Sequence, residues 1–247
     1  MEIAWRLPAR LGLASSRRPL LVVLTIACAL GIGHVLAGSD GSPEEQRLLL
    51  GVHTSLVAIV LAAAAIDLDH MILPNALTLG GAALALATAP LRAVGLGGAA
   101  LGAAVGLALT VLPFLLYKRL RGRSGMGRGD AMLAIFAGAW LGEQGVRAVV
   151  FLGAVQNVLG AVLLRALGRA YPIPVSVVAE LDALRARAAN GDAEAAAELA
   201  DDPMSAAVEG GVLTTRLPLG PFLALACVEV LFARRWLIQH VFAWIAG

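Results

Sequence analysis

The sequence contains few charged residues, few aromatic residues and only two cysteines. Of its 247 residues 15% are charged, 5% are aromatic and 59% are hydrophobic. A soluble domain averages about 25% charged and about 45–50% apolar residues, so this composition indicates an integral membrane protein. The net charge of +2, with no long basic run, gives no reason to expect nucleic-acid binding. Cys28 and Cys227 are isolated in apolar segments, so neither a Cys-x-x-Cys metal site nor a disulfide between them is predicted.

Long apolar runs predict an all-α fold, a polytopic membrane helix bundle with about seven transmembrane helices. Within the last apolar segment Arg234 and Arg235 interrupt the run, so we expect a helix that ends near Ala233 and a separate interfacial helix at 236–246. Glycines recur every four residues at 98, 102 and 106, and this stripe of small residues predicts contact with another helix. The expected spans are 19–38, 48–68, 72–90, 94–117, 130–146, 147–168 and one starting near 218.

Positive charges predict the orientation, because Lys and Arg concentrate on the cytoplasmic side of a membrane. Four arginines precede the first span, which places the N-terminus inside. Counting spans from there puts the basic segment 118–128, Asp67 and Asp130 on the same cytoplasmic face and Glu143 near the opposite surface. We therefore expect a multi-pass protein of the plasma (inner) membrane. The run after Ser16-Arg17-Arg18 also fits a cleaved signal, so retention of the first span stays open.

The chain divides into four expected parts. Residues 1–47 form the N-terminal tail, the first span and a short outer loop, and residues 48–168 form the membrane core that holds both aspartates. Residues 169–217 form a cytoplasmic helical insertion in which acidic residues outnumber arginines. Within it, Asn190-Gly191-Asp192 predicts a turn followed by a helix N-cap. Residues 218–247 form the C-terminal membrane segment. A solvated spacer is the default interpretation of the insertion.

Asp67 and Asp130 stand at the edges of long apolar segments. A carboxylate at membrane depth costs about 2.5–3.5 kcal/mol on insertion scales, so such a residue is rarely present without a use. Two of them suggest an acid/base pair. Asp69 lies about 200° around a helix from Asp67, so the two cannot face the same interior site and one of them is expected to be a solvated neighbour. Asp130 follows a glycine-rich stretch and opens an apolar helix, so helix capping alone is the competing explanation for it.

The residues around the two aspartates resemble the type IV prepilin peptidases. Asp67, followed seven positions later by Pro74 and Asn75, resembles the first catalytic motif of that family. The sequence Gly127-x-Gly129-Asp130 is similar to the second, which these enzymes share with presenilin-type intramembrane aspartic proteases. Residues 217–224, Leu-Pro-Leu-Gly-Pro-Phe-Leu-Ala, resemble a Pro-Phe-Gly-Pro-Phe-Leu stretch of the bacterial members. The three matches occur in the order that the family has.

The resemblance implies an intramembrane aspartic endopeptidase that needs no metal and no cofactor. Asp67 and Asp130 would be the catalytic pair, and the supporting motif residues would be Pro74, Asn75, Gly127 and Gly129. The implied substrate is a pilin-like precursor protein, in which a short basic leader precedes an apolar helix lying in the lipid bilayer.

Two departures from the family pattern stand out. Met132 occupies the place of a usual lysine, and the N-terminal region with paired Cys-x-x-Cys motifs is absent, so N-methylation of the product is not expected.

Two alternatives remain open at this stage. A small proton- or cation-coupled transporter would use the two aspartates as ligands and would need further polar residues at mid-membrane. The candidates, which share no evident helical face, are His34, His53, Gln156, Asn157 and Glu229. A catalytically weakened relative of the peptidases is the second alternative, because a cation at position 132 would tune the protonation of the carboxylates.

Overall fold

The computed structural model describes residues 18–38, 41–121, 128–169, 171, 173–201 and 217–240, and it confirms the all-α fold. By length and composition four helical stretches can cross a membrane, Pro19–Ala37, Pro43–His70, Gly95–Leu120 and Gly129–Ala166, and two shorter apolar helices accompany them. In chain order the elements are α1 (Arg18–Ala37), α2 (Pro43–His70), α3 (Asn75–Ala87), the 3-10 helix η1 (Ala89–Leu91), α4 (Gly95–Arg121), α5 (Arg128–Ala166), α6 (Val175–Ala189), α7 (Ala193–Asp201) and α9 (Gly220–His240).

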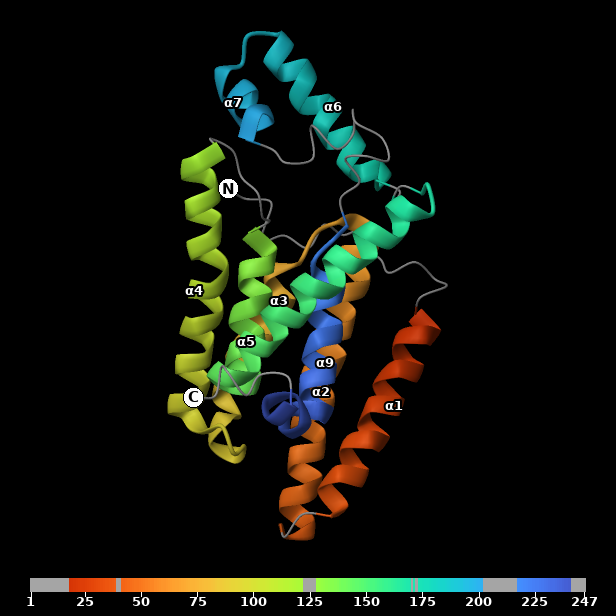
Figure 1. Cartoon of the computed structure of the whole chain (residues 1–247), viewed down its shortest axis with the longest axis vertical. Helices are drawn as coiled ribbons and strands as arrows, with labels where there is room; N and C mark the ends of the chain where they lie inside the picture. The colour runs from red at the N-terminus through yellow and green to blue at the C-terminus, as the bar shows by residue number, and fades with distance from the viewer. Residues whose placement is uncertain are drawn as a thin grey trace.

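The helices form a bundle around α2, α3, α5 and α9, with α4 against α5 and α1 to one side against α2 (Figure 1). The end of α2 and the starts of α5 and α9 reach the same end of the bundle, and α6 and α7 extend beyond it (Figure 1). The core holds large side chains with less than 2% exposure, among them Leu56, Leu133, Phe136 and Leu223. Apolar side chains on the outer faces of α1 and α4 are exposed, as lipid-facing helices require.

Helix α5 doubles back at Gly142. This residue has φ 74° and ψ −177°, a conformation that favours glycine because it has no Cβ. A Cβ placed on Gly106 of α4 would contact Ala134 and Val146 of α5, although a straight helix would separate those two residues by about 18 Å. The two segments of α5 therefore correspond to the two spans predicted at 130–146 and 147–168. The predicted boundary was wrong by several residues, because the polar residues Glu143, Gln144 and Arg147 and a second glycine, Gly145, follow Gly142, and this composition does not mark the residue at which the chain turns.

The small residues of α4 allow its backbone to lie against that of α5. Gly102 contacts Gly138 and Gly142, and Gly106 contacts the Ala134 carbonyl. The predicted helix contact is confirmed for these two glycines. A Cβ on Gly98 would meet only Val94 of the preceding turn, so the contact is looser at that end.

Arg92 connects the last turn of α3 to the turn of α5 before Gly142. Its side chain is only 7% exposed, and its guanidinium donates to the carbonyls of Ala85 and Trp140 and, at 3.2 Å, to that of Ala139. These carbonyls belong to the last turn of α3 and to the α5 turn before Gly142, where intrahelical partners run out. Burial lowers the pKa of Arg92 to about 10, so it remains protonated at neutral pH.

Two predicted helix boundaries are corrected. Helix α2 begins at Pro43 instead of residue 48, because Ser42 and Glu45 form a reciprocal capping box that extends it through polar residues. Helix α9 continues through Arg234 and Arg235 to His240, so the expected end near Ala233 is wrong. No Gly or Pro stands between 222 and 240 to end it. Residues 241–246 of the expected interfacial helix lie outside the described residues.

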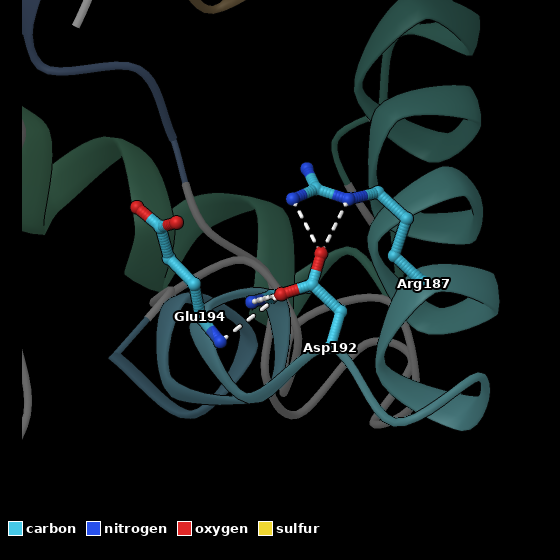
Figure 2. Close-up of polar contacts among 4 residues, drawn as sticks. Arg187, Asp192 and Glu194 are labelled. Carbon is cyan, nitrogen blue, oxygen red and sulfur yellow. Dashed lines mark hydrogen bonds and ion pairs between the residues drawn. The ribbon is translucent and has the colours of Figure 1, made fainter.

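Helices α6 and α7 form a pair joined by the turn Asn190–Asp192. Asp192 caps α7, since its Oδ1 accepts hydrogen bonds from the backbone N–H groups of Glu194 and Ala195, both at 3.1 Å (Figure 2). Its Oδ2 receives two further bonds from Arg187 of α6, at 2.6 and 2.9 Å (Figure 2). These bonds hold the pKa of Asp192 below its usual value, and the hydrogen bond from the Ala195 N–H makes the largest contribution. The sequence-predicted N-cap is confirmed.

Candidate active site

Asp67 lies in the last turn of α2, and the residue as a whole is only 5% exposed. The helix ends three residues later, at His70, because Met71 adopts a left-handed conformation with φ 53° and donates its N–H to the Asp67 carbonyl at 2.8 Å. Asp69, two residues further on, is half-buried. The helical direction thus separates the two carboxylates, and Asp67 is the one that points into the bundle.

Asp130 is the third residue of α5 and lies inside its first turn, not in front of the helix. It is half-buried and lies within electrostatic range of the carboxylate of Asp67. The structure therefore brings together the two aspartates that the sequence singled out. Helix capping alone does not account for Asp130, since a capping residue precedes the helix that it caps.

A third element, the start of α9, also reaches this site. The backbone N–H of Gly220 donates a hydrogen bond of 3.1 Å to Oδ2 of Asp67. Gly220 lies in the segment 217–224, which the sequence distinguished only by its resemblance and to which no role was given. The proline and glycine content of that segment indicates a turn but not which distant side chain the turn meets, so this contact was missed.

Leu73 packs between glycines that adjoin the two aspartates. It is 8% exposed, and a Cβ on Gly129 would lie 2.7 Å from the Leu73 Cβ. A Cβ on Gly220 would lie 3.1 Å from Leu73 Cδ2. Gly129 of the second motif is therefore required because the loop between α2 and α3 passes too close for a side chain.

The remaining motif residues lie at the edge of the site. Pro74 precedes α3, and its carbonyl accepts a hydrogen bond of 3.3 Å from the hydroxyl of buried Thr78. Asn75 is the first residue of α3 and is half-buried. Met132, two residues after Asp130, is also half-buried. Gly127 lies outside the described residues. Within the described ranges no group of three or more His, Cys, Asp or Glu side chains is placed to hold a metal ion.

The polar residues that a transporter would need instead connect helices in pairs. Trp140 Nε1 donates to His53 Nδ1 at 3.1 Å, and Gln156 Nε2 donates to Glu229 Oε2 at 2.6 Å. Asn157 donates to the carbonyls of Leu217 and Pro218, at 3.5 and 3.4 Å. His34 is exposed on α1. These contacts give the side chains a structural explanation that requires no transport pathway.

Residues 54–164 of the chain match the type IV leader peptidase family. Proteins named prepilin leader peptidase/N-methyltransferase align with it. The protein from Aeromonas hydrophila is 34% identical over 167 residues, which cover 65% of this chain and 54% of that protein. The one from Xanthomonas campestris pv. campestris is 38% identical over 133 residues, covering 48% and 43%, and the one from Pseudomonas putida is 37% identical over 153 residues, covering 61% and 50%.

The chain spans about half the length of the curated relatives it matches. No solved structure matches it. The matched region includes Asp67, Asp130 and the helices from the second half of α2 to the end of α5. Together with its apolar helices, this match identifies a multi-pass membrane protein.

Proposed function

Because residues 54–164 carry a type IV leader peptidase domain, we propose that the protein is an intramembrane aspartic endopeptidase in which Asp67 and Asp130 are the catalytic pair. The observation that carries the proposal is the position of a buried carboxylate, Asp67, within the electrostatic reach of Asp130 at the meeting point of α2, α5 and α9. Two adjacent carboxylates do not both ionise readily, so such a pair shares one proton.

One proton shared between two carboxylates supplies both a base and an acid. The ionised carboxylate takes a proton from a water molecule, whose oxygen attacks the scissile carbonyl carbon. The protonated carboxyl donates its proton to the carbonyl oxygen, which gives a tetrahedral intermediate. As the C–N bond breaks, the carboxyl that took the water proton passes it to the leaving amine. The other carboxylate takes a proton back from a hydroxyl of the intermediate, so the pair again holds one proton. No group outside the pair has to accept or supply a proton.

The substrate that we propose is a type IV pilin-like precursor. Its short basic leader would be removed at the cytoplasmic face of the inner membrane. The positive charges before α1 and after α4 support this location, because Lys and Arg concentrate on the cytoplasmic side. The proposal is supported by the names of the similar proteins, which are prepilin leader peptidases. The location at a bundle end supports it too, since hydrolysis needs water and the hydrocarbon core contains almost none. Labelling of single cysteines introduced at positions 123 and 144 from either side of the membrane tests the orientation.

The direct test is co-expression of the chain with candidate prepilins and detection of leader removal by a mass shift of the pilin. The two alternative functions predict other results. A transporter leaves every precursor intact, and a weakened peptidase cleaves slowly.

A further inference from the structure

Gly220 contacts Asp67 through the backbone and leaves no room for a side chain. Its N–H donates to Oδ2 of Asp67 at 3.1 Å. A Cβ at this position would lie 2.5 Å from the same oxygen and 3.1 Å from Asp67 Cγ. Gly220 is also the first residue of α9, where N–H groups lack intrahelical acceptors and the helix dipole favours a carboxylate. The helix start and the missing side chain therefore act on the same carboxylate.

The start of α9 is itself held in place by the second segment of α5. A Cβ on Gly153 would lie 3.2 Å from the Cα of Leu223, and one on Gly160 would lie 3.1 Å from the ring of Phe222. Between these glycines, Asn157 donates to the two carbonyls just ahead of Gly220. The first segment of the same helix carries Asp130. Helix α5 thus fixes Asp130 directly and Asp67 through the start of α9.

We propose that Gly220 is a positioning residue, which holds Asp67 against Asp130 by donating its backbone N–H to Oδ2 and by lacking a side chain. The hydrogen bond engages Oδ2, so proton exchange with water falls to the other oxygen, Oδ1. This inference rests on the proposed function for its kinetic consequences but not for the geometry that it describes. It also assigns to the C-terminal segment 217–224 the positioning of Asp67, in a site whose two aspartates come from α2 and α5.

The first experiment compares Gly220→Ala with a matched control, Gly80→Ala, in purified protein cleaving a prepilin peptide. Gly80 lies on α3 and a Cβ there would meet nothing within 4 Å. The atoms nearest to the new methyl at position 220 are side-chain atoms of Asp67 and Leu73, so the carboxylate shifts while the helices remain in place. We expect kcat of Gly220→Ala to fall by about 100-fold, since a misplacement of about 1 Å costs that much. KM should stay within about twofold because the substrate contacts remain.

A second experiment reads the geometry without any cleavage. In a Cys28→Ala, Cys227→Ala background, the pair Asp67→Cys and Asp130→Cys is oxidised and the disulfide yield is measured. Because a disulfide needs Cα atoms within about 7 Å, the yield reports how the two positions face each other. Addition of Gly220→Ala is expected to abolish most of this crosslinking, and addition of Gly80→Ala is expected to leave it unchanged.

Cleavage by Gly220→Ala within threefold of the wild type, or equal crosslinking with and without the methyl, would overturn the proposal. Failure of the two introduced cysteines to form a disulfide in the protein that keeps Gly220 would also overturn it. If the wild type cleaves no prepilin, the proposed function fails, and the crosslinking still decides the role of Gly220.

If Gly220→Ala does not accumulate, Asn157→Leu replaces it. This variant removes the donor to the 217–218 carbonyls and should lower kcat about tenfold with KM unchanged. Asn157→Gln, which keeps a donor, should recover part of the loss, and unchanged kcat in Asn157→Leu contradicts the proposal.

Discussion

Gly102 of α4 and Gly138 of α5 pack backbone against backbone. A Cβ on either residue would overlap the carbonyl oxygen of the other. This reciprocal contact lies on the segment of α5 that carries Asp130 in its first turn. Since lipid supplies little hydrophobic driving force between helices, such close van der Waals packing is the main source of their association.

A leucine at position 102 is expected to separate α4 from α5. The overlap involves backbone atoms, which cannot rotate away, so Gly102→Leu should destabilise the protein by about 3 kcal/mol, the upper end of the cost of overpacking. Thermal unfolding of the detergent-solubilised protein measures the change. The matched control is Gly97→Leu, because Gly97 is exposed on α4 with nothing within 4 Å of its Cβ position. Equal unfolding temperatures for the two variants would contradict the described contact.

Arg92 is expected to contribute strongly to the stability of the bundle. Arg92→Met keeps much of the side-chain volume but leaves the carbonyls of Ala85, Ala139 and Trp140 without this donor. An unsatisfied buried polar group costs about 1–3 kcal/mol, so the unfolding temperature should drop clearly. Arg92→Lys, which keeps a charge but not the forked donor geometry, should lie between the wild type and Arg92→Met. An unfolding temperature of Arg92→Met equal to that of the wild type would show that these bonds are not needed.

The α6–α7 pair is expected to loosen in acid. Since hydrogen bonds hold the pKa of Asp192 below its usual value, its stabilising contribution is present above the unfolded pKa of about 3.9 and is lost as pH falls through the folded value. Hydrogen exchange of the Glu194 and Ala195 amides should accelerate as the pH falls below about 4, after correction for intrinsic exchange. In Asp192→Ala the amides should exchange rapidly at neutral pH as well. Protection of both amides in Asp192→Ala would be the contrary result.

Met132→Lys tests whether the departure from the family pattern weakens the enzyme. In the proposed mechanism the two carboxylates carry the reaction, so restoring a cation near Asp130 should change kcat/KM by less than about tenfold. The measurement is cleavage of a prepilin peptide by the two forms at the same pH. A much larger gain would favour the alternative that this chain is a weakened peptidase.

The parts of the fold that follow a local period could be predicted from the sequence. The helical period predicted that Asp67 and Asp69 do not face the same site, and the family resemblance gave the choice of Asp67. The contact of Gly102 and Gly106 followed from their four-residue spacing. The two aspartates were placed at the same membrane face by counting spans, which needs only apolar lengths and the positions of the positive charges.

Long-range contacts could not be predicted in the same way. The α5 reversal depends on a single positive φ at Gly142. The polar and glycine residues that follow it do not mark which residue adopts that conformation, so the boundary was misplaced. From the sequence, Arg92 is expected to be an ordinary turn residue. The three carbonyls to which it donates are backbone groups, which no sequence pattern identifies. Gln156, Asn157 and Glu229 looked scattered because their partners lie on other helices or in the segment before α9. Gly220 belongs to the same class, since its partner is 153 positions away in the sequence.

The central claim is that Asp67 and Asp130 act together as the catalytic pair, and prepilin cleavage by asparagine variants tests it most directly. Asn is nearly isosteric with Asp and can accept the Gly220 hydrogen bond, but it cannot take a proton from water or share one with a partner. Asp67→Asn and Asp130→Asn should each abolish leader removal while both proteins insert in the membrane at wild-type levels. Asp69→Asn is the matched control from the same helix turn and should retain most of the activity. Leader removal at the wild-type rate by either Asp67→Asn or Asp130→Asn would contradict the two-carboxylate mechanism.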